Sequence, residues 1–209
     1  MASLNPFSNP QVTRRFIVLM AIATFVMFSI WAVVKSYTQT PLGDYEVRQG
    51  DIFLSDEKYD DALERFNAAL SVSPTHRGAM MGRALSFMLS GRTQEAETEL
   101  TNLIDFLKGN LEADDRTGTG TLAAAYNNRA ILLDRQCRHK EALADYIAAL
   151  TTDEVAVKGP GLIDKILYSA NPSTPLKRAQ FLHQRIDTLK EGECLLMPEK
   201  DAEERVYKP

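Results

Sequence analysis

The sequence lacks the motifs of known catalytic and metal-binding sites. Its 209 residues contain no Gly-x-Ser-x-Gly elbow, no His-Glu-x-x-His pair, no CxxCH haem motif and no dinucleotide-binding fingerprint. The three histidines, His76, His139 and His183, fall in a predicted loop, turn and late helix without metal-ligand spacing, so we interpret them as surface residues. We therefore expect a protein that is not an enzyme and has no catalytic residue, metal, cofactor or small-molecule substrate.

Cysteine is scarce, and basic charge is in deficit. Cys137 and Cys194 are the only cysteines, which excludes a disulfide scaffold and a CxxC site, and leaves open one bridge between them or two unpaired thiols. Residues 1–35 carry three basic groups and no acid, so residues 36–209 hold the other 21 basic groups against all 28 acidic ones, a net charge of −7. An acidic body argues against nucleic-acid binding, which favours a basic stripe.

One long segment has no charge, glycine or proline. It runs for 19 residues from Phe16 to Val34 and spans roughly 28 Å as a helix, close to the apolar thickness of a bilayer. A cleavable signal would have a shorter core and a small-x-small site, which is missing before Lys35. A twin-arginine signal usually has a weakly hydrophobic core, and a buried soluble helix would have a polar face. We therefore expect a permanent transmembrane helix over 16–35, in contact with the lipid bilayer.

The residues around this segment indicate its orientation. Arg14 and Arg15 precede it without any acid, whereas Lys35 and Arg48 follow it among acidic residues. Because positive flanks favour the cytoplasmic side, residues 1–15 are expected in the cytoplasm. In a bacterium, the chain would be a single-pass inner-membrane protein with its body in the periplasm.

Three later segments resemble one another: DDALERFNAAL, QEAETELTNLI and KEALADYIAAL. They align in a frame that gives repeats at 43–76, 77–110 and 123–156. Apolar residues recur in each repeat at spacings of three and four, the pattern of amphipathic helices, and two helices fit each unit. The sequence predicts an all-α fold, in which a single N-terminal transmembrane helix precedes an α-solenoid of about three repeats.

These repeats resemble the tetratricopeptide repeat family. The matching positions are Gly50, Phe53, Tyr59, Ala62, Phe66, Ala69 and Pro74 in the first repeat, Met80, Ala84, Phe87, Ala96, Leu100 and Leu103 in the second, and Tyr126, Ala130, Leu133, Ala142, Tyr146 and Ala149 in the third. Lys108 and Glu154 stand where the second and third repeats would have the closing proline. Cys137 occupies a turn position where the family often has glycine, so we expect it to be exposed.

The resemblance implies that the first helix of each repeat lines a concave groove that binds a protein partner. The groove positions predicted to bind it are Met81, Leu85, Met88, Asn127, Asn128, Ile131, Asp134 and Arg135. Asn128 matches a position that bonds an extended peptide's backbone in related proteins, although it could equally bond its own helix or water. The three apolar residues form either a docking strip or a surface covered by the C-terminal segment. The family's clamp for a C-terminal carboxylate is not kept.

The remaining segments are shorter. We expect residues 36–42 to form a linker, 111–122 (LEADDRTGTGTL) a mobile loop, 157–190 capping helices and 191–209 a tail. Thr174 and Pro175 have the pattern of a helix start. The apolar stripe expected to close the solenoid consists of Leu176, Ala179, Leu182, Ile186 and Leu189.

The short linker predicts where the partner lies. It holds the repeats close to the membrane, so we expect a protein partner in or on the same membrane. The leading interpretation is a non-enzymatic scaffold, an accessory or assembly subunit of a multisubunit membrane complex. The alternative is a periplasmic chaperone-like adaptor that transiently binds unfolded or nascent clients.

Overall fold

The computed structural model describes residues 10–38, 41–157, 174–189 and 193–195. The chain divides into two units, Met1–Pro41 and Leu42–Pro209. The expected cytoplasmic segment before Pro10, the Gly159-Pro160-Gly161 break and the tail after Leu195 lie outside the described residues.

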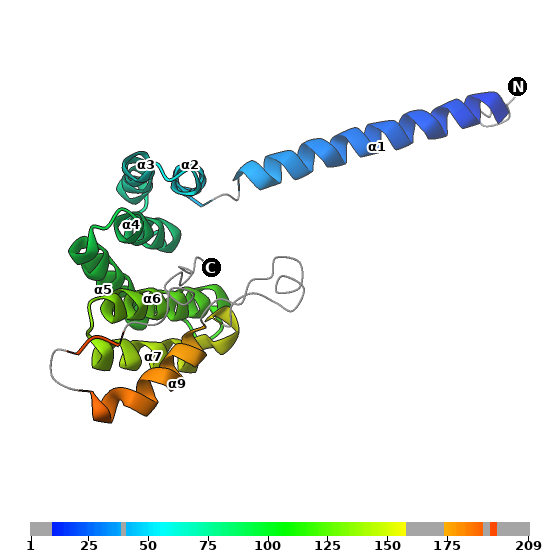
Figure 1. The fold of residues 1–209 in the computed structure, drawn as a ribbon. Coiled ribbons are helices and arrows are strands. Elements are labelled where there is room, and N and C mark those ends of the chain that lie inside the picture. The colour runs from blue at the N-terminus through cyan, green and yellow to red at the C-terminus, as the bar shows by residue number, and fades with distance from the viewer. Residues whose placement is uncertain (1–9, 39–40, 158–173, 190–192, 196–209) are drawn as a thin grey trace, which may run out of the picture. The chain divides into compact units, whose positions relative to one another are not determined.

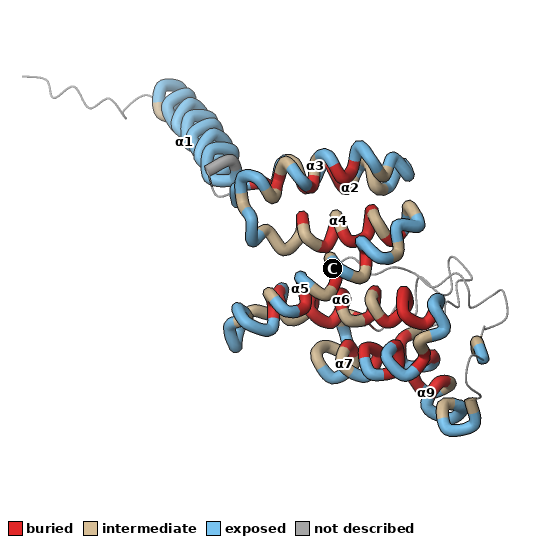
Figure 2. Tube along the Cα trace, turned by 90° about the vertical axis from the view of Figure 1, so that its left-hand side faces the viewer, coloured by how far each residue is buried: buried red, intermediate tan, exposed pale blue. Residues whose placement is uncertain are grey.

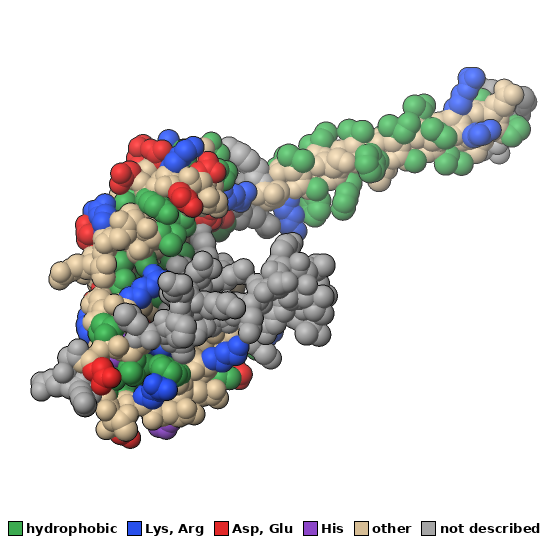
Figure 3. Space-filling view, in the orientation of Figure 1, with side chains coloured by type: hydrophobic (Ala, Val, Ile, Leu, Met, Phe, Trp, Pro, Cys, Tyr) green, Lys and Arg blue, Asp and Glu red, His purple; other side chains and the backbone are tan. Residues whose placement is uncertain are grey.

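The first unit contains one long apolar helix, α1 (Pro10–Thr38). Its stretch Pro10–Ser36 has a mean hydropathy of 2.6 over its most apolar window, none of which is buried, and it is long and apolar enough to cross a membrane. The hydroxyls of Thr24 and Ser29 each donate to a carbonyl four residues earlier, at 2.8 Å, so neither leaves its O–H without an acceptor within the helix. Figure 3 shows hydrophobic side chains along α1 and basic side chains toward its N-terminal end.

The second unit contains helices and no strand among its described residues (Figure 1). Its elements are α2 (Asp44–Ser55), α3 (Tyr59–Val72), α4 (Arg77–Leu89), α5 (Thr93–Asn110), α6 (Arg116–Arg135), α7 (His139–Val157), α9 (Pro175–Arg185) and the 3₁₀ turn η1 (Ile186–Thr188). The pairs α2–α3, α4–α5 and α6–α7 are the three predicted helix pairs. Helix α3 contacts α4 and α5 contacts α6, so each pair packs on the next, and α9 packs on α7 (Figure 2). The predicted α-solenoid is confirmed.

The three turns inside the helix pairs have the same backbone geometry. Glu57, Gly91 and Cys137 occupy equivalent positions and have positive φ angles of 60°, 77° and 62°. A left-handed residue ends the first helix and reverses the chain, which is why glycine is favoured there. Glu57 and Cys137 adopt this conformation with a Cβ, which costs roughly 1–2 kcal/mol each.

The segment between the second and third repeats differs from the expected loop. Helix α6 begins at Arg116, and the Asp115 side chain caps it by accepting from the Gly118 amide at 2.7 Å. This hydrogen bond and the neighbouring Arg77 hold the pKa of Asp115 below its usual value. A Cβ at Gly118 would lie 2.4 Å from Arg77 Nη1, so the glycine provides room for this ion pair. The Thr-Gly alternation therefore marks a capped helix start.

The second and third repeats each contain an equivalent ion pair, which the sequence alone did not predict. Arg83 of α4 donates to Glu99 of α5 at 2.7 and 2.9 Å, and Arg129 of α6 donates to Asp145 of α7 at 2.6 and 2.8 Å. Each pair spans 16 residues from the first to the second helix of its repeat. These two-donor contacts fix how the two helices are aligned.

Phe66 connects the first repeat to the second. Its side chain is fully buried in a cluster with Val47, Ala62, Ala69 and Ala79. Glycine is required at two positions next to its ring, since a Cβ at Gly50 would lie 2.6 Å from it and a Cβ at Gly82 only 2.3 Å. The ring thus lies between the first helices of two successive repeats.

We predict that Gly82→Ala destabilises the chain by about 1–3 kcal/mol, because the added methyl overlaps the Phe66 ring. Phe66→Leu in the same background should recover part of this loss. Gly109→Ala is the matched control, since nothing lies within 4 Å of its Cβ position in α5, and alanine there should be neutral or slightly stabilising. Thermal unfolding of the detergent-solubilised chain measures the effects, and equal shifts at the two glycines would contradict this account.

Candidate functional site

The predicted groove residues lie on two neighbouring helices. Met81, Leu85 and Met88 are on α4, and Asn127, Asn128, Ile131, Asp134 and Arg135 are on α6. The two helices are in contact, and Asn128 Nδ2 donates to Met81 Sδ at 3.6 Å, a long and weak hydrogen bond to sulfur. The structure therefore brings the two halves of the predicted set together.

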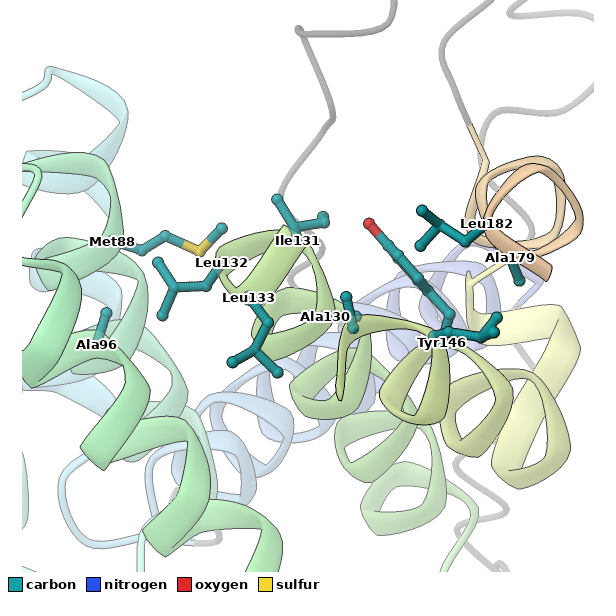
Figure 4. Close-up of a cluster of buried hydrophobic side chains, with 11 residues drawn as sticks. Met88, Ala96, Ala130, Ile131, Leu132, Leu133, Tyr146, Ala179 and Leu182 are labelled. Atoms are coloured by element: carbon teal, nitrogen blue, oxygen red, sulfur yellow. The ribbon is translucent and has the colours of Figure 1, made fainter. Parts of the chain in front are cut away.

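All of these residues except Arg135 are buried, with at most 6% of their surface exposed. Met81 and Leu85 belong to a core cluster with α5 side chains such as Leu100 and Leu103. Met88 and Ile131 belong to a second cluster with Ala179 and Leu182 of α9 (Figure 4). Leu195, farther along the chain, packs against this cluster. The apolar strip is therefore part of the core, and the binding role of these residues remains a prediction.

Asn127 has an unusual environment for an amide. It has no exposed surface, and both polar atoms of its side chain are buried without a hydrogen-bond partner in the structure. A buried donor or acceptor in this state costs roughly 1–3 kcal/mol relative to a satisfied one. We call Asn127, which lies at a predicted groove position, the groove amide, and its binding role remains a prediction.

At the end of the third repeat lies a polar centre that we call the C-terminal clasp: Asp134, Cys137, His139, Arg178 and residues 194–195. Asp134 is its centre, and its carboxylate accepts from His139 Nδ1 at 2.7 Å and from Arg178 Nη2 at 2.9 Å. Arg178 Nε makes a second, close contact with the other carboxylate oxygen. The three side chains are at most 5% exposed, so this ion pair is shielded from water.

The clasp holds the C-terminal segment, residues 193–195, through the backbone amide and carbonyl of Leu195. The Leu195 amide donates to His139 Nε2 at 2.9 Å, and the Leu195 carbonyl accepts from Arg178 Nη2 at 2.9 Å. Because Nε2 accepts here, the ring proton lies on Nδ1 and is donated to Asp134. His139 is therefore a neutral imidazole whose orientation is fixed at both nitrogens.

A disulfide makes the third attachment. Cys137 and Cys194 are bonded with their Cα atoms 5.0 Å apart, which resolves the two alternatives left open by the sequence. Cys137 is exposed, as expected, and Cys194 is partly exposed. The bridge joins the turn between α6 and α7 to a segment 57 residues later, directly beside the hydrogen bonds of Leu195.

Two of the three histidines are not surface residues, so that interpretation was wrong for them. His139 has a fully buried side chain, and His76 is 13% exposed, caps α4 by accepting from the Ala79 amide at 3.3 Å and bonds Asp44 at 2.8 Å. Only His183 is exposed. The hydrogen bonds of His76 to Asp44 and of His139 to Leu195 join residues far apart in the sequence, so the sequence did not reveal them. Only the position of His139 two residues after Cys137 could have indicated its site.

The capping helix α9 begins as expected, and its buried face keeps most of the predicted stripe but has Arg178 in place of Leu176. The Thr174 hydroxyl accepts from the Lys177 amide at 3.3 Å, and Pro175 is in the first turn. Ala179 and Leu182 are buried as predicted, but Leu176 is 44% exposed, and Arg178 is buried instead. The ion pair with Asp134 sets the rotation of α9, which the apolar pattern alone could not indicate.

On the surface beside the clasp, one arginine pairs with two glutamates. Arg138 donates to Glu97 of α5 at 2.7 and 2.8 Å and to Glu141 of α7 at 2.6 and 2.8 Å. The guanidinium holds the pKa of Glu141 below its usual value. These contacts lock the α6–α7 turn onto α5.

Comparison with known proteins finds a family match over part of the chain. Residues 47–105 match the family model of the tetratricopeptide repeat. No curated protein matches the sequence. The chain is similar to the TPR domain of Arabidopsis OM64, with 16% identity and a TM-score of 0.48, covering 70% of this chain and 95% of that one. It is also similar to the Sgt2 TPR domain from Aspergillus fumigatus, with 13% identity and a TM-score of 0.51, covering 77% of this chain and 91% of that one. At 13% identity, the likeness to the Sgt2 domain shows the fold alone.

We predict that Arg178→Met destabilises the chain by about 3–5 kcal/mol, because it leaves the Asp134 carboxylate buried without its cation. Adding Asp134→Asn should recover part of the loss, since no uncompensated charge then remains. Arg135→Met is the control, because Arg135 follows Asp134 in the chain but is exposed, and the substitution should leave the free energy of unfolding unchanged. Thermal unfolding and the hydrogen exchange of the Leu195 amide are the measurements, and similar effects of the two arginine substitutions would contradict the role of the clasp.

Proposed function

We propose that this chain, whose helix pairs are tetratricopeptide repeats, is a non-enzymatic scaffold anchored in a membrane by α1, and an accessory or assembly subunit of a membrane protein complex. Tetratricopeptide repeats are protein-interaction modules, and among the described residues of this chain no catalytic constellation accompanies them. The proposal adds that the repeats lie at a membrane and that their partner belongs to a membrane protein complex.

The observation that carries the proposal is the short connection between the two units. Helix α1 ends at Thr38 and α2 begins at Asp44, so only residues 39–43 separate them. At about 3.3–3.6 Å per residue, this connection extends to no more than roughly 20 Å. If α1 spans a membrane, α2 must lie close to that membrane's surface, where a partner in or on the same membrane is within reach.

Two further observations support an extracytoplasmic repeat domain, which would be periplasmic in a bacterial inner membrane. Disulfides persist in oxidising compartments and are rare in the cytosol, and Cys137 and Cys194 are bonded. Arg14 and Arg15 of α1 precede its apolar stretch, residues 16–34, and residues 1–15 contain no acid, which favours a cytoplasmic N-terminus.

The proposal predicts that the chain, purified at its native level in mild detergent, copurifies with a companion membrane protein in a fixed stoichiometry. A photo-crosslinker at Arg135, the exposed groove position, should then yield one main adduct. A variant in which an unrelated apolar helix replaces residues 10–36 is the control for the anchor, and should lose the companion if α1 contributes contacts. A chain that purifies alone would contradict the proposal, and a ladder of many adducts would favour the chaperone-like adaptor.

The second prediction concerns the groove amide. Asn127→Leu removes two buried polar atoms that have no partner, so it should stabilise the free chain by about 1–3 kcal/mol. If Asn127 bonds the partner's backbone, the same change should reduce recovery of the companion severalfold. Arg116→Met, at an exposed position of the same helix outside the predicted groove, is the control and should leave recovery of the companion unchanged. A variant that is stabilised yet binds the companion normally would remove Asn127 from the binding surface.

A further inference from the structure

We propose that, once its disulfide is reduced, the C-terminal clasp binds a zinc ion through Cys137, His139 and Cys194. One ligand atom from each of these residues lies within 4.8 Å of the other two. Two thiolates and an imidazole are a donor set that Zn²⁺ prefers, and three protein ligands leave a fourth position for water. The inference concerns a second site and does not depend on the proposed function.

His139 has the orientation that a zinc ligand requires. Its Nδ1–H is donated to Asp134 at 2.7 Å, which leaves the Nε2 lone pair directed toward the segment that carries Cys194. Metal-bound histidines have this arrangement, in which a carboxylate fixes the ring and raises the basicity of the coordinating nitrogen. Arg178 in turn contacts both carboxylate oxygens of Asp134 and so fixes the carboxylate that orients the His139 ring.

The ligand-bearing segments need only a small movement. Two sulfurs that bind one tetrahedral ion at about 2.3 Å lie roughly 3.8 Å from each other, so the bonded sulfurs must separate by about 2 Å. Cys137 and His139 belong to the same turn and start of α7, whereas Cys194 lies on the short C-terminal segment. Movement of that segment opens the site and breaks the hydrogen bond from the Leu195 amide to His139 Nε2.

The chemistry is a two-electron reduction followed by metal binding. A dithiol reductant breaks the Cys137–Cys194 bond, supplies two electrons and two protons to form two thiols, and becomes a disulfide itself. Zn²⁺ then displaces the two thiol protons to water, and its third bond forms with the Nε2 lone pair. Cys137 is exposed, so a reductant and the ion can reach the site from solvent. The bridge and the ion are thus alternative ways of holding the same segment.

The test uses the full chain in detergent, reduced anaerobically with a phosphine and titrated with Co²⁺ as a spectroscopic probe for zinc. We expect one Co²⁺ per chain, with thiolate charge-transfer bands and the visible bands of a tetrahedral ion, displaced by Zn²⁺. The oxidised chain should show none of them. Cys194→Ser should weaken binding at least about tenfold, and His183→Ala, at the exposed histidine of α9, should leave it unchanged. Equal uptake by the oxidised and reduced chains would overturn the proposal.

Two measurements on the unsubstituted chain keep the test independent of how a His139 variant folds. X-ray absorption of the zinc-loaded chain should show two sulfur and one imidazole nitrogen ligand, and a shell of oxygen and nitrogen alone would overturn the proposal. Zinc should also slow alkylation of both thiols at least about tenfold while the Leu195 amide exchanges faster than in the oxidised chain, because Nε2 no longer accepts from it. Alkylation at the same rate with and without zinc would likewise overturn it.

Discussion

A solenoid of helix pairs has no closed core, so its last repeat must bury an apolar face against something other than another repeat. In this chain, α9 takes that place, and it packs on α7 with Ala179 and Leu182 in the same cluster as Tyr146. Burial of apolar area has no direction and would not by itself fix the rotation of a short helix. The contact between Arg178 and Asp134 supplies that direction, and the position of the C-terminal segment follows from it.

The clasp shows how one buried ion pair can order several elements. Asp134 is near the end of α6, His139 begins α7, Arg178 is in α9 and Leu195 lies beyond η1. A buried pair is weak evidence for extra stability, because removing the two charges from water offsets most of their attraction. What it provides is a single arrangement, since another rotation of α9 would move Arg178 away from the buried Asp134 carboxylate. The disulfide then keeps Leu195 within reach of its hydrogen bonds.

The parts of the fold that could be predicted are those set by residues close in sequence. Apolar residues at spacings of three and four predicted two helices in each repeat, and the family's usual glycine position predicted that Cys137 lies in a turn. The TGTGT segment was misread because glycine usually interrupts helices, whereas here Asp115 caps the helix and Gly118 gives Arg77 room. His139, Arg178 and the burial of Met88 could not be predicted, because each depends on partners 40 or more residues away.

Cys137 links the general fold to what is particular in this chain. The repeat requires a left-handed residue at this turn, and Gly91 meets the requirement in the second repeat without strain. A cysteine with φ of 62° is less favourable there than glycine, so its presence calls for a compensating contact. The left-handed turn places its sulfur beside His139 and the segment of Cys194. The same backbone conformation that ends α6 therefore creates the site in which the C-terminal segment is held, whether by a sulfur–sulfur bond or by a shared ion.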